Sequence, residues 1–151
     1  TLIKDAKAFN YTIDKMAEMI KDLNFNRVVA IESRGFVFAS VLAYKLSKSL
    51  ILVRKKNKLP ADTFSEDFEL EYGKATIEIH KDSIQKNEKV IIVDDLIATG
   101  GTAKAAAKLV ERSGGKIVSF IFVINLFDLG GKDRLEKELY KTLTLIDFPG
   151  H

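Results

Sequence analysis

Short apolar runs alternate with amphipathic stretches along the 151 residues of the chain. Short runs composed mostly of apolar residues predict strands at 27–31, 50–53, 90–93, 117–124 and 143–146. Each run has the length of a buried strand, and none approaches the roughly 20 residues that cross a bilayer. The strands are therefore expected to form the core of a globular domain.

Between these runs, apolar residues recur at spacings of three and four, which predicts helices. The first helix has Asp5 as its N-cap, and its apolar face comprises Phe9, Ile13, Met16, Ala17 and Ile20. Further helices are predicted after residue 35, from about 102 to the glycines at 114–115, and over 132–140. Strands alternating with helices predict an α/β fold, in which helices flank a central, mostly parallel sheet.

The segment 54–73 does not follow this alternation. It holds a basic cluster at 54–58, Pro60 and acidic residues at 62–71, with few paired apolar positions. We interpret it as a long exposed excursion with strands at its base around 75–79. Loops of this length without structure of their own are uncommon and often functional.

The segment 90–104, Val-Ile-Ile-Val-Asp-Asp-Leu-Ile-Ala-Thr-Gly-Gly-Thr-Ala-Lys, carries the strongest chemical signal. A buried strand delivers Asp94 and Asp95 to the sheet edge, where such folds bind ligands. Carboxylates accept hydrogen bonds from sugar hydroxyls. Directly afterwards, 98–102 offers backbone amides, two hydroxyls and two glycines at a helix start, which suits an anion. One bend with acceptors for a diol and donors for a phosphate fits a ribose 5-phosphate.

Other features of the sequence exclude several functions. The bend lacks the Gly-Lys-Ser/Thr of a Walker A loop and the Gly-x-Gly-x-x-Gly of a dinucleotide turn. The absence of cysteine excludes disulfides and thiolate chemistry and fits the cytoplasm. No segment predicts a membrane span or an export signal. Because the first residue is not methionine, we expect a native N-terminal segment to precede Thr1.

The segment 90–104 resembles the phosphoribosyl pyrophosphate (PRPP) signature of the type I phosphoribosyltransferases. Three further stretches resemble the adenine-specific members: Ala-Ile-Glu-Ser-Arg-Gly-Phe at 30–36, Val-Arg-Lys-Lys-Asn-Lys-Leu-Pro at 53–60, and Leu-Glu-Tyr-Gly-Lys at 70–74 leading to Glu-Ile-His-Lys-Asp at 78–82. The resemblance extends from Asp5 to about Ile146. It implies one phosphoribosyltransferase domain over 1–151 that lacks an N-terminal hood segment.

The resemblance also implies an activity. A member of this family is a glycosyltransferase of the pentosyltransferase class, which joins adenine to the phosphoribosyl group of PRPP in purine salvage. The products are AMP and pyrophosphate. Asp94 and Asp95 would hold the ribose hydroxyls, and the 5-phosphate would lie against Ala98, Thr99, Gly100, Gly101 and Thr102.

Two other stretches would contact pyrophosphate by resemblance. One is the turn of Glu32, Ser33 and Arg34, with a non-proline cis peptide expected between Glu32 and Ser33. The other is the basic group of Arg54, Lys55 and Lys58, which lies at a dimer interface in the family. The residue matching Arg54 there reaches the neighbouring subunit's site. The resemblance therefore implies a homodimer with shared active sites.

Glu71 is the candidate catalytic residue. Bond formation between the ribose C1 and a purine nitrogen passes through an oxocarbenium-like state, and a nearby carboxyl group can manage the base's proton. By resemblance, Glu71 and Tyr72 belong to a long flexible loop that closes over the site and excludes water. Leu126 matches the apolar floor beneath the purine ring. Asn57 and Ala61 occupy positions in the basic segment where glycine is frequent.

The sequence leaves two other functions open. One is a phosphoribosyltransferase for another purine such as xanthine, although members acting on 6-oxopurines tend to lack the Glu-Tyr-Gly stretch. The other is a regulator that senses PRPP without catalysis, against which Glu71 and the basic segment argue.

Cofactor and partners follow from the same resemblance. Mg²⁺ should arrive bound to the PRPP phosphates, so no protein metal site is expected. The expected substrates are PRPP and adenine. The net charge of +3 and the absence of evident stacking platforms argue against nucleic acid, and no membrane partner is expected.

Overall fold

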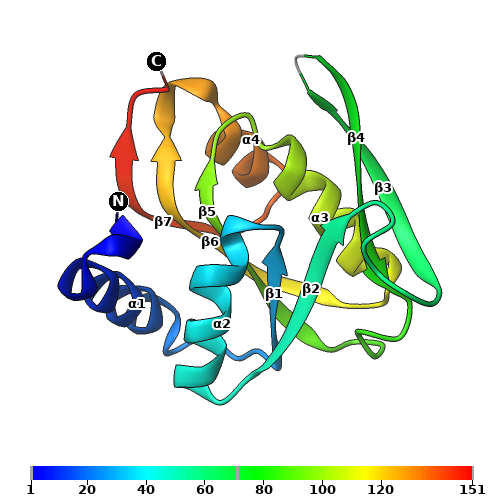
Figure 1. The fold of residues 1–151 in the computed structure, drawn as a ribbon, viewed down its shortest axis with the longest axis horizontal. Helices are drawn as coiled ribbons and strands as arrows, with labels where there is room; N and C mark the ends of the chain where they lie inside the picture. Colours follow the sequence, from blue (N-terminus) through cyan, green and yellow to red (C-terminus); the bar gives the residue numbers. More distant parts are fainter. Residues whose placement is uncertain (1, 71, 151) are drawn as a thin grey trace.

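The computed structural model describes residues 2–70 and 72–150. A seven-stranded sheet with the order β3-β4-β2-β1-β5-β6-β7 forms its centre (Figure 1). Its parallel strands are β1 (Arg27–Ile31), β2 (Ser49–Lys55), β5 (Lys89–Ile97), β6 (Lys116–Leu126) and β7 (Thr142–Phe148). The predicted strands are confirmed, each of the last four being longer than its apolar run.

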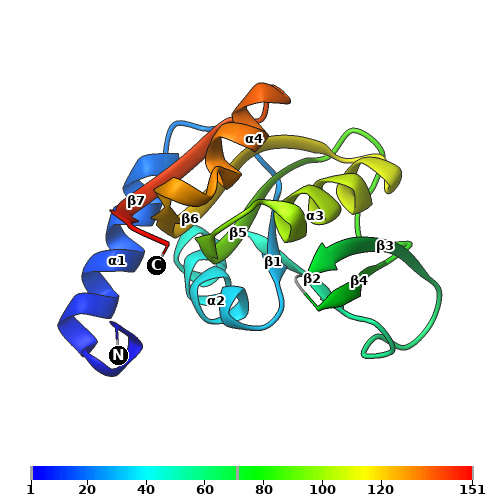
Figure 2. The same cartoon turned by 90° about the horizontal axis from the view of Figure 1, so that it is seen from above.

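Helices cover both faces of the sheet, as predicted. On one face lie α1 (Ala6–Ile20) and α2 (Arg34–Leu46), and on the other α3 (Gly101–Arg112) and α4 (Gly131–Lys137) (Figure 2). Two short 3-10 helices, η1 (Leu2–Lys4) and η2 (Phe127–Leu129), complete the described helices. Alternate residues of β1 and β5 enter the two cores, which is why these strands read as continuous apolar runs.

The first helix confirms the sequence signals in detail. Asp5 is its N-cap, and its Oδ1 accepts hydrogen bonds from the amides of Lys7 at 3.0 Å and Ala8 at 3.2 Å. The predicted apolar face is buried at Ile13, Met16, Ala17 and Ile20. None of the helices within the described residues is long and apolar enough to cross a membrane.

The direction of sheet growth reverses between β1 and β5. From β1 the chain adds β2 on one side, and β5, β6 and β7 follow on the other. In open parallel sheets, ligands bind in the crevice beyond the carboxyl ends of strands at such a reversal. The turns after β1 and β5 both border this crevice, and these are the two turns that the sequence analysis singled out.

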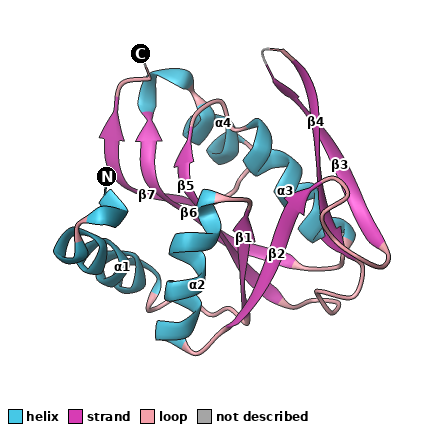
Figure 3. Ribbon diagram, in the orientation of Figure 1, coloured by secondary structure: helices cyan, strands magenta, loops and turns pink. Residues whose placement is uncertain are grey.

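The expected excursion is more ordered than its sequence indicated. It forms a hairpin of β3 (Thr63–Leu70) and β4 (Gly73–His80), paired antiparallel along its whole length (Figure 3). Only Glu78 and Ile77 of β4 pair with β2, at Arg54 and Lys55. Asn57 and Ala61, in the connection to the hairpin, adopt positive φ angles of 67° and 66°. That conformation accounts for glycine being suited to these two positions.

Candidate functional site

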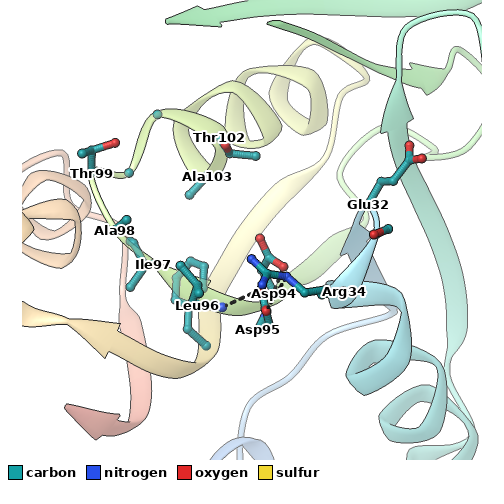
Figure 4. A pocket seen from close by; sticks show the side chains of 14 residues that line it. Glu32, Arg34, Asp94, Asp95, Leu96, Ile97, Ala98, Thr99, Thr102 and Ala103 are labelled. Carbon is teal, nitrogen blue, oxygen red and sulfur yellow. Dashed lines mark hydrogen bonds and ion pairs between the residues drawn. The ribbon is translucent and has the colours of Figure 1, made fainter. Parts of the chain in front are cut away.

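A cavity of about 220 Å³ lies at the reversal between β1 and β5 (Figure 4). It is lined by the turn after β1, the end of β5, the bend that follows, and one residue of β6. The lining residues are Glu32, Ser33, Arg34, Asp94, Asp95, Leu96, Ile97, Ala98, Thr99, Gly100, Gly101, Thr102, Ala103 and Phe122. The structure therefore brings together both acids, the whole of the bend and the 32–34 turn.

The paired acids reach the cavity because β5 loses one neighbour. β5 pairs with β1 only as far as Val93, whereas its ladder with β6 continues to Ile97. The strand thus runs on through both acids, beyond the apolar run 90–93 from which it was predicted. On the open side, Asp94 Oδ1 accepts the Asp95 amide at 2.8 Å, and Asp95 Oδ1 accepts the Leu96 amide at 2.9 Å. These bonds fix the two carboxyl groups at the crevice.

The pKa of Asp94 is strongly perturbed. Burial, together with the nearby charge of Asp95, raises the pKa of Asp94 to about 8. The backbone also approaches it closely, since a Cβ on Gly35 would lie 2.9 Å from Asp94 Oδ1. The first turn of α2 can pack against this carboxyl group only with glycine at position 35.

Arg34 bridges the two halves of the cavity. It is the first residue of α2, and its Nε lies 2.9 Å from Asp95 Oδ2. Its side chain is 72% exposed, whereas that of Asp95 is 16% exposed. In Figure 4 the guanidinium lies beside both acids. Arg34 is thus an exposed cation at the mouth of the cavity, paired with an acid of the opposite wall.

The bend after β5 presents a cradle for an anion. Gly100 adopts a φ of 88°, a region that favours glycine, and α3 begins at Gly101. Among the hydrogen bonds of the described residues, none has the amide of Thr99, Gly100, Gly101 or Thr102 as donor. Four open amides at a helix start attract negative charge.

Contacts with β2, on the side away from the cavity, hold the 32–34 turn in place. A cis peptide joins Glu32 to Ser33, as the sequence analysis expected. The Glu32 carboxylate accepts the Lys55 amide, and it lies 3.4 Å from Arg54 Nη2. Burial alone would raise the pKa of Glu32, but the Lys55 amide and Arg54 lower it below its ordinary value. Glu32 therefore stays ionised and holds the turn to the sheet.

Several predicted residues lie outside this cavity. Arg54, Lys55, Lys58 and Leu126 are not among the described residues that line it. Arg54 packs against the ring of Phe36, with its guanidinium carbon 5.9 Å from the ring centroid, and its Nε is buried without a partner.

The expected loop residues also do not line the cavity. Tyr72 is 94% exposed, at the turn of the β3–β4 hairpin. Glu71, the candidate catalytic residue, lies outside the described residues.

The structure adds four lining residues that sequence reasoning missed. Leu96, Ile97 and Ala103 lie within the recognised segment, but their apolar side chains carried no chemical signal. Phe122 of β6 pairs in register with Asp94. Its place follows only from strand order, which is not encoded in any local pattern. No group of three or more His, Cys, Asp or Glu side chains in the described residues is arranged to hold a metal ion.

The family model of the phosphoribosyl transferase domain matches residues 2–150, nearly the whole chain. The chain belongs to this family. The α/β fold with a mostly parallel, helix-flanked sheet is the fold of its solved members, so the predicted fold class is confirmed.

The individual proteins that resemble the chain include several adenine phosphoribosyltransferases. The chain is 64% identical over 151 residues to an adenine phosphoribosyltransferase of Pelagibacter ubique, covering 100% of this chain and 86% of that protein. The crystal structure of the adenine phosphoribosyltransferase of Thermoanaerobacter pseudethanolicus superposes with a TM-score of 0.93 at 48% identity, covering 97% and 84% of the two chains.

A third member was solved with ligands. It is the adenine phosphoribosyltransferase of Saccharomyces cerevisiae, in complex with an imino-altritol bisphosphate and adenine. It shares 36% identity with this chain and has a TM-score of 0.87, over 95% of this chain and 82% of that one.

Proposed function

We propose that this chain is an adenine phosphoribosyltransferase, which converts adenine and PRPP into AMP and pyrophosphate. One observation carries the proposal: the cavity between β1 and β5 sets two carboxyl groups a few residues from four open amides. The relatives named above support the choice of adenine. We assign the whole chain, 1–151, to this one catalytic domain.

The proposed pose of PRPP follows from the chemistry of the lining. The 5-phosphate lies against the amides of Thr99–Thr102, where the start of α3 also favours negative charge. The ribose 2- and 3-hydroxyls donate to Asp94 and Asp95. C1 of the ribose then lies toward the 32–34 turn on the opposite side of the crevice.

Arg34 changes partner in this scheme. When PRPP occupies the cavity, its ribose hydroxyls donate hydrogen bonds to Asp95. The Arg34 guanidinium then leaves Asp95 and binds the pyrophosphate group. Paired guanidinium donors suit phosphate oxygens. As N9 of adenine bonds to C1, the C1–O bond to pyrophosphate breaks, and pyrophosphate leaves with the bonding electrons. Arg34 stabilises this developing negative charge.

Magnesium enters with the substrate. The pyrophosphate group of PRPP supplies oxygen ligands that Mg²⁺ prefers, and Asp94 and Asp95 are engaged with the ribose in the proposed pose. In this scheme the ion belongs to the substrate and not to a resident protein site.

Each active site is completed by a second subunit in this proposal. Arg54, Lys55 and Lys58 do not line the cavity of their own chain, and we assign them to a neighbour's pyrophosphate. Arg54 would exchange its contact with Glu32 for that pyrophosphate. Along α2, the side chains of Val37, Val41 and Tyr44 are exposed on one face, Tyr44 to 88%. We take this α2 stripe as part of the dimer interface, and we place the enzyme in the cytoplasm.

In this mechanism Glu71 takes up the proton that adenine loses as N9 bonds to C1. The variant Glu71→Gln should lower kcat by about 100-fold or more, the range of a general acid or base, with little change in the KM for PRPP. Glu69→Gln, the same substitution at an exposed position of β3, is the matched control. An unchanged kcat in Glu71→Gln would remove Glu71 from the mechanism.

A single assay decides between the proposed function and the two alternatives. The protein is mixed with PRPP, Mg²⁺ and, separately, adenine, hypoxanthine, guanine or xanthine, and the nucleotide formed is identified. We expect AMP from adenine with a far higher kcat/KM than for the other bases. Preference for xanthine would contradict the adenine assignment, and PRPP binding without any product would indicate a sensor.

A further inference from the structure

The start of α4 packs against the back of the phosphate-binding bend, away from the cavity. The Gly131 amide donates to the Ala98 carbonyl at 2.9 Å. One turn later along α4, Arg134 Nη1 donates to the Thr99 carbonyl at 3.4 Å. Two consecutive carbonyl groups of the bend are therefore bound by a helix that does not itself line the cavity.

These two contacts bear on where the amides of the bend point. A trans peptide unit is planar, and its C=O and N–H bonds point to opposite sides of the chain. The Ala98 carbonyl shares its peptide unit with the Thr99 amide, and the Thr99 carbonyl shares its unit with the Gly100 amide. Because α4 binds both carbonyls, it keeps these oxygens away from an anion that the amides would bind.

The contact leaves no room for a side chain on the α4 side. A Cβ on Gly131 would lie 2.4 Å from the Ala98 oxygen and 2.8 Å from the Gly100 nitrogen. On the other side, a Cβ on Gly100 would lie 3.2 Å from Gly131 Cα. Gly131 does not adopt a positive φ, so the need for glycine there comes from this close backbone approach alone.

We propose that Gly131, assisted by Arg134, is a positioning residue for the 5-phosphate of PRPP. It contacts no substrate atom; it acts by fixing the peptide planes of Ala98–Thr99 and Thr99–Gly100. The inference rests on the proposed function only in naming the ligand. Its chemistry applies to any phosphorylated pentose bound by the bend.

The first test is the variant Gly131→Ala. Its added methyl group forces the bend away from α4, so binding of ribose 5-phosphate, measured by calorimetry, should weaken by on the order of tenfold. The KM for PRPP should rise to a similar extent, while the KM for adenine stays within about twofold. The control is Gly130→Asn, because no atom lies within 4 Å of the added Cβ and asparagine tolerates its φ of 78°.

A second pair of variants tests the carbonyl contact without a steric clash. Arg134→Met removes the donor to the Thr99 carbonyl, whereas Arg134→Lys keeps an N–H donor on a side chain only one bond shorter. We expect the Met variant to raise the KM for PRPP several-fold and the Lys variant to restore most of the loss. A loss in the Met variant that disappears at high ionic strength would indicate long-range charge and contradict positioning by Arg134.

The outcomes separate the two claims. If Gly131→Ala folds and binds ribose 5-phosphate as tightly as the unaltered protein, the positioning role is wrong, whatever the reaction. If it does not fold, the Arg134 pair decides, and an unchanged KM in Arg134→Met overturns the inference. If the unaltered protein binds ribose 5-phosphate but forms no nucleotide, the proposed function fails, and the binding comparison still tests Gly131.

Discussion

At the scale of single residues, Asp94 meets two conflicting demands. The proposed function requires it in the crevice beside a sugar hydroxyl, yet it is largely buried there and lies next to Asp95. Burial and the Asp95 charge favour the protonated form, which is why the pKa of Asp94 rises to about 8. Because Arg34 is paired with Asp95, the free-energy cost of ionising a buried acid here falls on Asp94.

The raised pKa of Asp94 makes the free energy of unfolding depend on pH. The folded protein binds a proton at Asp94 up to about pH 8, whereas the unfolded chain releases it near the ordinary value of 3.8. Between these limits the unfolded state binds fewer protons, so stability falls as pH rises, by at most about 1.4 kcal/mol per pH unit. Asp94→Asn removes this loss, and its Tm advantage over the unaltered protein should be at least about 4 °C larger at pH 8 than at pH 5.

The measurement is thermal unfolding at several pH values between 5 and 9. Asp22→Asn is the control for the substitution itself, because the Asp22 side chain is exposed after α1. A pH-independent difference for Asp94→Asn would show that Asp94 is ionised in the folded protein.

At the scale of elements, the β3–β4 hairpin shows how one charged residue can interrupt the apolar alternation by which a strand is recognised in a sequence. Phe64, Glu66 and Phe68 alternate on the face turned toward α3, and the charge in the middle breaks the apolar pattern. The structure satisfies that charge with Arg112, at the end of α3. Arg112 Nη1 lies 3.2 Å from Glu66 Oε1 and donates to the Ser65 carbonyl at 2.7 Å, while its guanidinium covers the Phe64 ring.

Arg112 therefore connects the β3–β4 hairpin to α3. The other end of α3 begins at the bend after β5. Arg112→Ala should speed amide hydrogen exchange in β3 several-fold, because only two residue pairs join the hairpin to β2. The loss of global stability should be about 1 kcal/mol, since the contacts are partly exposed.

Hydrogen exchange followed by mass spectrometry measures the effect segment by segment. Lys108→Ala is a matched control on the same helix, because the Lys108 side chain is exposed and makes no hydrogen bond or ion pair with the described residues. Equal exchange in β3 for the Arg112 and Lys108 variants would contradict the fastening role.

At the scale of the whole molecule, the sequence predicted the α/β layers, the β1 and β5 turns and the paired acids, because each leaves a local pattern. It did not predict that β5 continues to Ile97, since the pairing with β6 that extends it is non-local. The same holds for Gly131, which reaches the bend from a distant helix. Position 122 read only as core until the strand register placed it beside Asp94.

The proposed dimer also belongs to this scale. Val41→Glu places a charge in the middle of the exposed α2 stripe and should convert the protein to a monomer in sedimentation velocity, with most of the activity lost. Leu139→Asn, at a position 93% exposed with a φ of 68°, is the control and should remain dimeric. A fully active monomer would show that no site is shared between subunits.

The most direct test of the account is a crystal structure of the protein with ribose 5-phosphate. We predict that the phosphate oxygens accept hydrogen bonds from the amides of Thr99–Thr102 and that both ring hydroxyls lie within hydrogen-bonding distance of Asp94 and Asp95, with Arg34 displaced from Asp95. A sugar phosphate bound in the reverse orientation, or outside the cavity between β1 and β5, would contradict it.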